Sequence, residues 1–495
     1  MNQSISRNVA FLVSGTITSA FFTFVYWYVL ATITSTEIVG VVSTVINFAF
    51  IIQIISTLQI PFGMKRFLGQ AYSNQDNKTF SSYGMISLVL MIITVSFTIL
   101  VLVVFSPILL NISGLDHVYL PFIAILIIVP SFQHLFQEIL ISTNKSKNVA
   151  IPIIIGTALR LPFLILLVLV FEFHEIGLLI SFVIATIIAS LLMVVYVTKT
   201  IFMPKNFIYE FKQKYKEIIQ ASIPKYIPEV LFRTSLHSGI LVIFALHSAS
   251  ETGVYNILLI TVSFFLSISL SVSSVLHPKI SGASAEKQYQ LASRSIFLTF
   301  MFLMPFVSVF YVFSEEMLGL VGNEYRKGGL ALAILMISLP AHIFWSGVYH
   351  FSHAKGNYRQ VYYMGTTQAV ITITSYFILV PTYSLIGAAT AFALGSVSTV
   401  IVSAIVAKQS KLKLEYKKYF IIIALPIMIL SLLYLIKVNF IISFFITVLV
   451  SFVIYIKINY FTEKELNLVA DAVSIKSTSK LYSTLVSIIN RFKAK

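Results

Sequence analysis

The chain has 495 residues, of which 58% are hydrophobic and only 11% are charged. Ordinary soluble domains carry about 25% charged residues, so this composition excludes that class and indicates a chain that folds in a membrane. The formal net charge of +16 needs to be judged by its distribution, because basic residues can report membrane topology as well as nucleic-acid binding.

Apolar segments long enough to cross a bilayer recur along the whole chain. A helix needs about 20 apolar residues to cross a hydrocarbon core of about 30 Å while satisfying its own backbone groups. The sequence predicts about fourteen such helices, at residues 8–32, 38–60, 80–106, 118–142, 148–171, 175–198, 219–247, 252–277, 292–313, 329–353, 359–380, 384–407, 418–436 and 439–460. We therefore expect an all-α polytopic membrane protein.

Lysine and arginine are concentrated in alternate loops between these segments. With the amino terminus placed inside, about 28 of the 34 lie on the cytoplasmic side and three lie outside. This bias follows the positive-inside rule. We expect a multi-pass protein of the cell (plasma) membrane with both termini in the cytoplasm, and no nucleic-acid partner.

The sequence offers little for covalent chemistry. It contains no cysteine, which removes disulfides and thiolate metal sites. It also has no phosphate-binding glycine loop, zinc-binding helix or serine nucleophile elbow. We expect no catalytic residue, no metal and no cofactor, and a protein that is not an enzyme.

The two halves of the chain resemble each other at a nearly fixed offset. "ATITSTEIVG" from Ala31 matches "ALHSASETGV" from Ala245, an offset of 214, and three further matches follow in order at offsets of 208, 209 and 210. Transporters are often duplicated in this way, and halves with an even number of helices are parallel, with a binding site between them. The repeat predicts six-helix lobes at 1–205 and 206–410, two additional transmembrane helices at 411–460 and a cytoplasmic tail at 461–495.

A charged stripe stands at the start of the seventh predicted span. "PKYIPEVLFRTSLH" places Lys225, Glu229, Arg233 and His237 four residues apart, which puts them on one helix face. A charge at the bilayer centre costs about 2.5–3.5 kcal/mol, so these side chains should not face lipid. Either they lock helix packing as an ion pair, or they line a cationic groove. Arg160 adds a cation in "PIIIGTALRLPFL", and the planar fork of arginine suits phosphate.

Further polar residues lie inside other predicted spans. Glu138 follows His134 by four residues in "QHLFQE", His342 lies in the tenth span and Asn47 in the second. Such residues carry protons, line a polar cavity or hydrogen-bond between helices. The sequence leaves these alternatives open.

Several segments are similar to those of a known family. They are "RNVAFLVSG", "TSTEIVGVVS", "ASIPKYIPEVLF", "SASETGVYNIL", "VLHPKIS", "LVGNEYRKGGLALAIL" and "VPTYSLIGAATAFALG". From residue 7 to about 410 the chain resembles the polysaccharide biosynthesis or oligosaccharide flippase family (Wzx-type) of the multidrug/oligosaccharidyl-lipid/polysaccharide exporter superfamily. The resemblance implies two six-helix lobes around a central cavity that opens alternately to either side.

The same resemblance implies a cargo and its partners. The cargo is a polyprenyl-phosphate-linked or polyprenyl-diphosphate-linked oligosaccharide, moved from the cytoplasmic to the outer leaflet for surface polysaccharide or glycoprotein assembly. Membrane lipids and glycan assembly enzymes are the other expected partners. Substrate phosphate is expected to bind at Lys225, Arg233 and Arg160. Coupling or cavity roles are expected for Glu229, His237, Glu138, His342 and Asn47.

Two other functions compete with this interpretation. A multidrug or small-molecule exporter of the same superfamily, coupled to a cation, usually has twelve helices rather than fourteen. A membrane glycosyltransferase or polymerase needs carboxylates or bases gathered in a sizeable outer loop. The outer turns predicted here are short, which counts against the enzyme.

Overall fold

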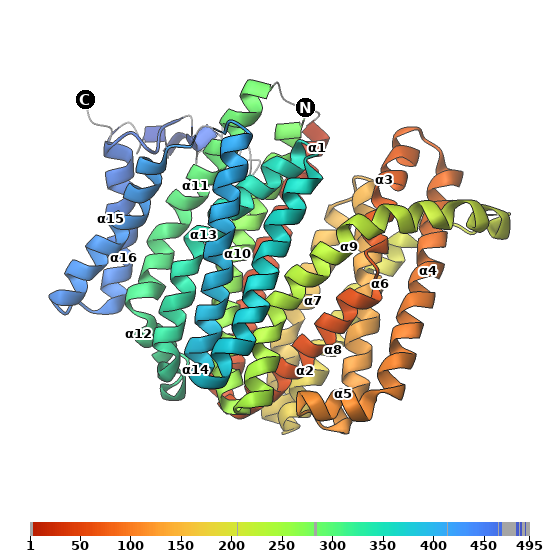
Figure 1. Cartoon of the computed structure of the whole chain (residues 1–495), viewed down its shortest axis with the longest axis horizontal. Helices are drawn as coiled ribbons and strands as arrows, with labels where there is room; N and C mark the ends of the chain where they lie inside the picture. Colours follow the sequence, from red (N-terminus) through yellow and green to blue (C-terminus); the bar gives the residue numbers. More distant parts are fainter. Residues whose placement is uncertain are drawn as a thin grey trace. The chain divides into compact units, whose positions relative to one another are not determined.

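The structure of the chain is a computed structural model that describes residues 3–204, 206–281, 285–412, 414–463, 465–467, 482–484, 486–487 and 491. Most of the tail predicted at 461–495 lies outside the described residues. Within the described part of the chain the regular elements are helices, without a strand (Figure 1). Their bounds are α1 (Gln3–Ile33), α2 (Thr36–Ser56), α3 (Ile60–Ser73), α4 (Asn77–Val104), α5 (Ser106–Ser113), η1 (His117–Tyr119), α6 (Leu120–Ser142), α7 (Lys147–Leu164), η2 (Ile165–Val170), α8 (His174–Val197), α9 (Phe207–Leu246), α10 (Ala249–Ser281), α11 (Ala285–Val312), α12 (Ser314–Gly319), η3 (Asn323–Gly328), α13 (Gly329–Ala354), α14 (Tyr358–Gln409), α15 (Tyr416–Leu435) and α16 (Phe440–Lys457).

The number of membrane-spanning helices agrees with the sequence. Among the described residues, 13 helices are long and apolar enough to cross a membrane. One of them, α14, has 52 residues and a non-helical backbone at Ser384, with φ 42° and ψ −118°. This kink separates the predicted spans 359–380 and 384–407, so α14 contains both. The all-α polytopic fold is confirmed.

Besides the short helices α5 and α12, two longer helical segments were not predicted. The 14-residue helix α3 follows directly after α2, with a proline at its start. It is too short and too polar to span a bilayer, but its buried residues Ile60, Met64 and Leu68 recur every four positions, as in an amphipathic helix. The second segment is the beginning of α9, which starts at Phe207, 12 residues before the predicted span at 219.

Helix α9 changes direction along its length (Figure 1). Pro224 and Pro228 lie inside it, and each removes a backbone donor from the helical ladder, which is a common cause of a bend. The bend lies at the beginning of the charged stripe. Residues 207–218, which lie between the predicted spans, therefore form a helix that continues into the stripe.

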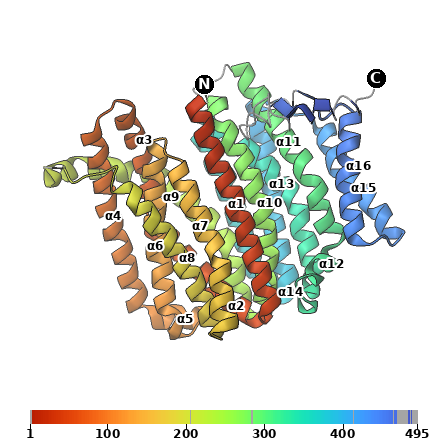
Figure 2. The ribbon, with the colours of Figure 1, turned by 180° about the vertical axis from the view of Figure 1, so that it is seen from behind.

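The chain forms two compact units. The α2–α9 unit comprises Thr18–Ile257 and Thr372–Ala388, and the α11–α16 unit comprises Met1–Ile17, Leu258–Ile371 and Ala389–Lys495. In the first unit, α9 packs against α2, α3 and α4, and α6 packs against α2, α3 and α8. In the second unit, α11 packs against α13, α15 and α16 (Figures 1 and 2). The division into lobes at 1–205 and 206–410 stays a prediction.

The repeat found in the sequence has a counterpart in space. The Thr36 and Ser250 hydroxyl oxygens lie 2.8 Å apart at the first turns of α2 and α10. These residues are 214 positions apart, which is the offset of the matched segments "ATITSTEIVG" and "ALHSASETGV". Contact between equivalent positions is the expected signature of a two-fold relation.

Candidate functional site

The charged stripe lies along one face of α9. Arg233 Nε donates a hydrogen bond of 3.0 Å to Glu229 Oε1, while Lys225 Nζ lies 3.8 Å from Glu229 Oε2. The side chain of Arg233 is 50% exposed and that of Glu229 is 19% exposed. One carboxylate is thus shared by two cations, as the spacing of the residues indicates.

A second ion pair lies beside the stripe. Lys65 Nζ of α3 is 2.9 Å from Glu138 Oε2 of α6, and both charges act on Lys225. The ammonium of Lys225 lies 4.2 Å from the centroid of the Phe62 ring. The charges of the stripe and of Glu138 also act on the ring of His134. We call this group the polar cluster and define it as Lys65, His134, Glu138, Lys225, Glu229 and Arg233.

A close helix contact holds α3 against α9 beside the polar cluster. A Cβ atom on Gly63 would lie 2.1 Å from Ser222 Oγ and 2.6 Å from the Ile218 carbonyl oxygen, so only glycine allows this approach. The Tyr226 hydroxyl donates to the Ile55 carbonyl oxygen of α2 at 3.2 Å. These contacts fix α9 against α2 and α3.

His237 and Asn47 form a direct pair. His237 Nδ1 donates to Asn47 Oδ1 across 2.6 Å, joining α9 to α2. The imidazole also packs edge to face on Phe50, with ring centroids 5.8 Å apart. The sequence predicted a polar role for both residues separately, and the structure brings them together one turn beyond Arg233.

Arg160 occupies a different environment in the same unit. Its Cζ atom lies 3.7 Å from the centroid of the Phe182 ring, and its charge acts on Tyr26. Its Nε atom is buried and makes no hydrogen bond to any described residue. The Phe182 ring lies 6.4 Å from the Phe50 ring, centroid to centroid. Phe50 therefore contacts both Phe182 and His237 and connects the two cationic regions.

The two regions lie at different depths. Glu138 is four residues from the end of α6 at Ser142, and Arg160 is 13 residues from the start of α7 at Lys147. A four-residue turn joins these helix ends, so both count from the same side of the membrane. At 1.5 Å per residue, Glu138 is about 6 Å and Arg160 about 20 Å from that side. The polar cluster thus contains a shallow residue at Glu138, and Arg160 lies deeper.

His342 lies in the α11–α16 unit. The Gln368 amide nitrogen donates to its Nε2 across 3.1 Å, and the imidazole stacks on Phe392 with centroids 5.4 Å apart. The residue is only 3% exposed. This environment is that of a hydrogen-bonded polar residue between α13 and α14.

The arrangement is suited to an anion. Among the described residues, no group of three or more His, Asp or Glu side chains is placed to hold a metal ion. The polar cluster contains the basic residues Lys65, Lys225 and Arg233 against two carboxylates. The terminal nitrogens of Arg233 make no hydrogen bond to the described residues, so they are available to a phosphate.

Sequence reasoning missed Lys65, Phe50 and Phe182. Lys65 lies on the amphipathic helix α3, whose pattern was available, but its partner Glu138 is 73 positions away. Phe50 and Phe182 were indistinguishable from the other aromatic residues of apolar spans. Their places next to His237 and Arg160 follow from tertiary packing alone.

Comparison with known proteins places the chain in a family. The family described as "Polysaccharide biosynthesis protein" matches residues 5–284, more than half of the chain. No match was found among curated protein sequences.

Solved structures with the same fold are membrane transporters. The lipid II flippase MurJ in an inward closed conformation superposes with a TM-score of 0.74 at 15% identity, covering 91% of this chain and 98% of the flippase. An inward-facing multidrug resistance MATE family transporter of the MOP superfamily gives 0.63 at 13% identity, covering 80% and 94%. A mutant of the Vibrio cholerae MATE transporter VcmN gives 0.59 at 14% identity, covering 84% and 99%. With its fold shared by these transporters and its sequence matched over more than half its length, the chain belongs to the polysaccharide biosynthesis protein family.

Proposed function

We propose that this protein is a flippase that moves a polyprenyl-phosphate-linked or polyprenyl-diphosphate-linked oligosaccharide from the cytoplasmic to the outer leaflet by alternating access. The proposal is carried by the polar cluster, where three cations face two carboxylates inside a membrane protein. Membership of the polysaccharide biosynthesis protein family supports the class of cargo.

The charge excess favours a phosphate-bearing cargo. Glu229 is shared between Lys225 and Arg233, so it neutralises only one of them. Burying unbalanced positive charge is costly, and an anionic ligand removes that cost when it binds. Arg233 is half exposed, and its planar fork can donate two parallel hydrogen bonds to a phosphate.

Arg160 supports a second position for the phosphate. It lies deeper in the membrane than Glu138, by about 14 Å counted along the helices. Its Nε atom is buried without a partner among the described residues, and a buried donor left unpaired costs about 1–3 kcal/mol. We infer that the phosphate first binds at Lys225 and Arg233 and then meets Arg160.

The aromatic residues between these positions suit a sugar headgroup. Phe50 and Phe182 lie between His237 and Arg160, where the Asn47–His237 pair adds a polar edge. We propose that these four side chains contact the headgroup, while the prenyl chain stays in the lipid. Coupling or cavity roles of Glu229, His237, Glu138, His342 and Asn47 stay predictions.

Location and partners form part of the proposal. Thirteen candidate spans among the described residues support a multi-pass membrane protein. We infer the cell membrane with cytoplasmic termini from the distribution of lysine and arginine. The lipid-linked oligosaccharide and membrane lipids are the proposed partners, with glycan assembly enzymes beside them, and the protein acts without covalent catalysis.

Deleting the gene and measuring polyprenyl-linked glycans by mass spectrometry tests the function. We expect a complete lipid-linked oligosaccharide to accumulate while its surface polymer is lost. A truncated glycan would indicate an enzyme instead. An unchanged lipid pool with altered drug sensitivity would indicate the exporter.

Complementation of the deletion tests the site. At matched protein levels, Arg233→Ala should fail to restore surface polymer, and Arg233→Lys should restore part of it. Lys78→Gln removes an exposed charge at the start of α4 and serves as the control. Full activity of Arg233→Ala would remove Arg233 from the site, and loss of folded protein would favour a packing role.

A further inference from the structure

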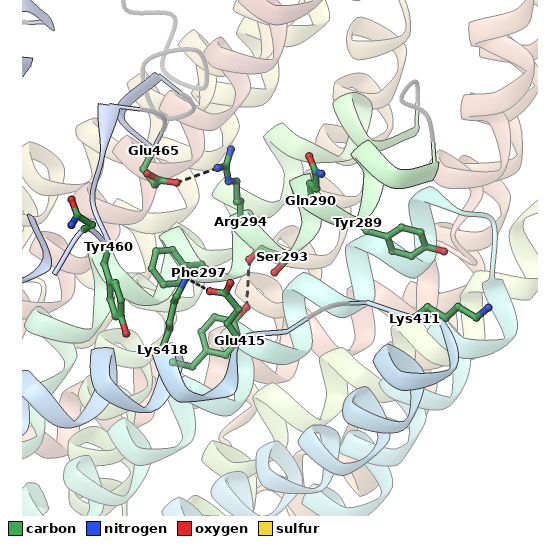
Figure 3. A pocket seen from close by; sticks show the side chains of 12 residues that line it. Tyr289, Gln290, Ser293, Arg294, Phe297, Lys411, Glu415, Lys418, Tyr460 and Glu465 are labelled. Atoms are coloured by element: carbon green, nitrogen blue, oxygen red, sulfur yellow. Dashed lines mark hydrogen bonds and ion pairs between the residues drawn. The ribbon is translucent and has the colours of Figure 1, made fainter.

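A pocket outside the proposed transport site lies in the α11–α16 unit. Its volume is about 680 Å³, within the range of small-molecule sites, about 300–1,000 Å³. It lies where α14 ends and α15 begins, beside α11 and the segment after α16 (Figure 3). The lining residues used below are Arg294, Phe297, Lys411, Glu415, Lys418, Tyr460 and Glu465.

The lining carries an excess of positive charge. Arg294, Lys411 and Lys418 face two carboxylates, Glu415 and Glu465, which leaves a formal charge of +1. Lys418 is paired with Glu415 three residues before it. Figure 3 shows Lys411 apart from the other two cations, so Arg294 and Lys418 form the basic part of the pocket.

Arg294 has N–H donors that are not used by hydrogen bonds within the described part of the chain. Its Nη2 atom lies 3.7 Å from Glu465 Oε1, too far for a hydrogen bond. Glu465 is held in place by its other oxygen, which accepts from the Thr462 backbone nitrogen at 3.2 Å. The guanidinium makes no hydrogen bond to the described residues, although it has five N–H donors.

The surroundings are those of a membrane interface. The pocket lies at the ends of membrane-spanning helices, on the side predicted to be cytoplasmic, where basic residues attract anionic lipid. Tyr460 and Phe297 stack edge to face at 5.7 Å, and aromatic rings are enriched at this depth. Phe420, which follows the lining residue Tyr419 in α15, is 72% exposed and offers an apolar surface for acyl chains.

We propose that this pocket binds the phosphate group of an anionic phospholipid of the adjacent leaflet, with Arg294 and Lys418 as its ligands. The phosphodiester accepts from the Arg294 guanidinium and from the Lys418 ammonium. The headgroup fills the pocket beside the packed rings of Phe297 and Tyr460, and the acyl chains lie along α15. The site is independent of the cargo proposed above.

Native mass spectrometry of the full chain in neutral detergent tests the proposal. The probes are phosphatidylglycerol, phosphatidylcholine and inorganic phosphate, each titrated separately. We expect wild type to retain one phosphatidylglycerol molecule in preference to phosphatidylcholine. Arg294→Gln should weaken this binding about tenfold, since hydrogen bonds to charged groups contribute about 1.5–3 kcal/mol. Arg294→Lys keeps the charge but not the planar fork of donors, so its affinity for phosphatidylglycerol should lie between those of wild type and Arg294→Gln.

Lys437→Gln is the matched control. Lys437 is an exposed cation in the turn between α15 and α16, at the opposite end of the helix pair from the pocket. Equal lipid retention by wild type and Arg294→Gln would overturn the proposal, as would binding of inorganic phosphate without lipid. If Arg294→Gln does not fold, Lys418→Gln replaces it. This variant should also weaken retention of phosphatidylglycerol, and unchanged retention would count against the site.

Discussion

Gly40 of α2 and Gly253 of α10 meet at a crossing that admits no side chain. A Cβ atom on Gly40 would lie 1.8 Å from the Ala249 carbonyl oxygen, and one on Gly253 would lie 1.9 Å from the Thr36 carbonyl oxygen. Each glycine thus faces the backbone four residues before the other. This reciprocity is the arrangement expected around a two-fold axis between the repeated segments.

Gly40→Ala should destabilise the conformation in which α2 and α10 cross. The added methyl group collides with backbone rather than with a flexible side chain, and overpacking of this kind costs about 1–3 kcal/mol. We expect a lower melting temperature of the purified protein. We also expect easier labelling of a single cysteine introduced at Thr36, which is only 4% exposed, since the chain has no cysteine of its own.

Gly69→Ala is the control for this prediction. A Cβ atom on Gly69 of α3 meets nothing within 4 Å, so the melting temperature should stay the same or rise slightly. If Gly40→Ala and Gly69→Ala behave alike, the crossing is not a constraint on the fold.

Arg160→Met should separate stability from transport. The buried Nε atom has no partner among the described residues, so methionine removes an unsatisfied donor while losing the contact of the guanidinium with Phe182. These effects oppose each other, and the free energy of unfolding should stay within about 1 kcal/mol of wild type. Surface-polymer complementation should nevertheless be lost.

The exposed residue Arg66 of α3 provides the matched control, and Arg66→Met should keep transport. Full complementation by Arg160→Met would show that the deeper cation takes no part in binding the cargo.

Lys65→Gln should reduce transport with little change in stability. In the ion pair with Glu138, the side chain of Lys65 is 46% exposed and that of Glu138 is 14% exposed. The glutamine amide can still donate a hydrogen bond to the buried carboxylate, which limits the loss of stability. Removing the charge of Lys65 leaves the polar cluster with two cations and two carboxylates, which weakens attraction for a phosphate. The amount of surface polymer should therefore fall in cells that produce Lys65→Gln. It should stay unchanged in cells that produce the control variant Lys78→Gln. An equal effect of both variants would point to a general influence of surface charge.

Asp76 gives the turn between α3 and α4 a local dependence on pH. Its Oδ1 accepts from the Thr79 backbone nitrogen at 3.0 Å and caps α4. Hydrogen bonds from the Thr79 side chain and backbone lower the pKa of this carboxyl below its usual value of 3.8. Since the folded pKa is depressed, the contribution of the cap is present above pH 3.8 and is lost as pH falls through the lower, folded value.

Hydrogen exchange at the Thr79 amide, measured as pH is lowered, checks this dependence. Exchange corrected for its intrinsic rate should rise in wild type below about pH 4, whereas Asp76→Asn should show no such rise, because asparagine caps without titrating. The same pH profile in both proteins would contradict the capping role.

Much of the fold could be predicted because hydrophobicity and spacing are local properties. The stripe from Lys225 to Arg233 follows from helical periodicity alone, and the repeat predicted an equivalence that Thr36 and Ser250 display in space. The pairing of Lys65 with Glu138 could not be predicted, because it depends on which faces of α3 and α6 meet.

The pocket lined by Arg294 and Lys418 could not be predicted for a related reason. In the sequence, Lys411 and Lys418 were interpreted only as basic residues on the cytoplasmic side, which the positive-inside rule already explains. The place of Lys418 near Arg294, more than 100 positions away, depends on the packing of α11 against α15.

Reconstitution tests the central claim most directly. The purified protein is placed in liposomes with a polyprenyl-diphosphate-linked oligosaccharide, and a membrane-impermeant glycosidase reports the fraction of glycan exposed outside. With wild type, that fraction should rise above the amount initially present in the outer leaflet, while Arg233→Ala should stay at the level of empty liposomes. Wild type that leaves the glycan where it was, yet moves a cationic drug across the same membrane, would contradict the account.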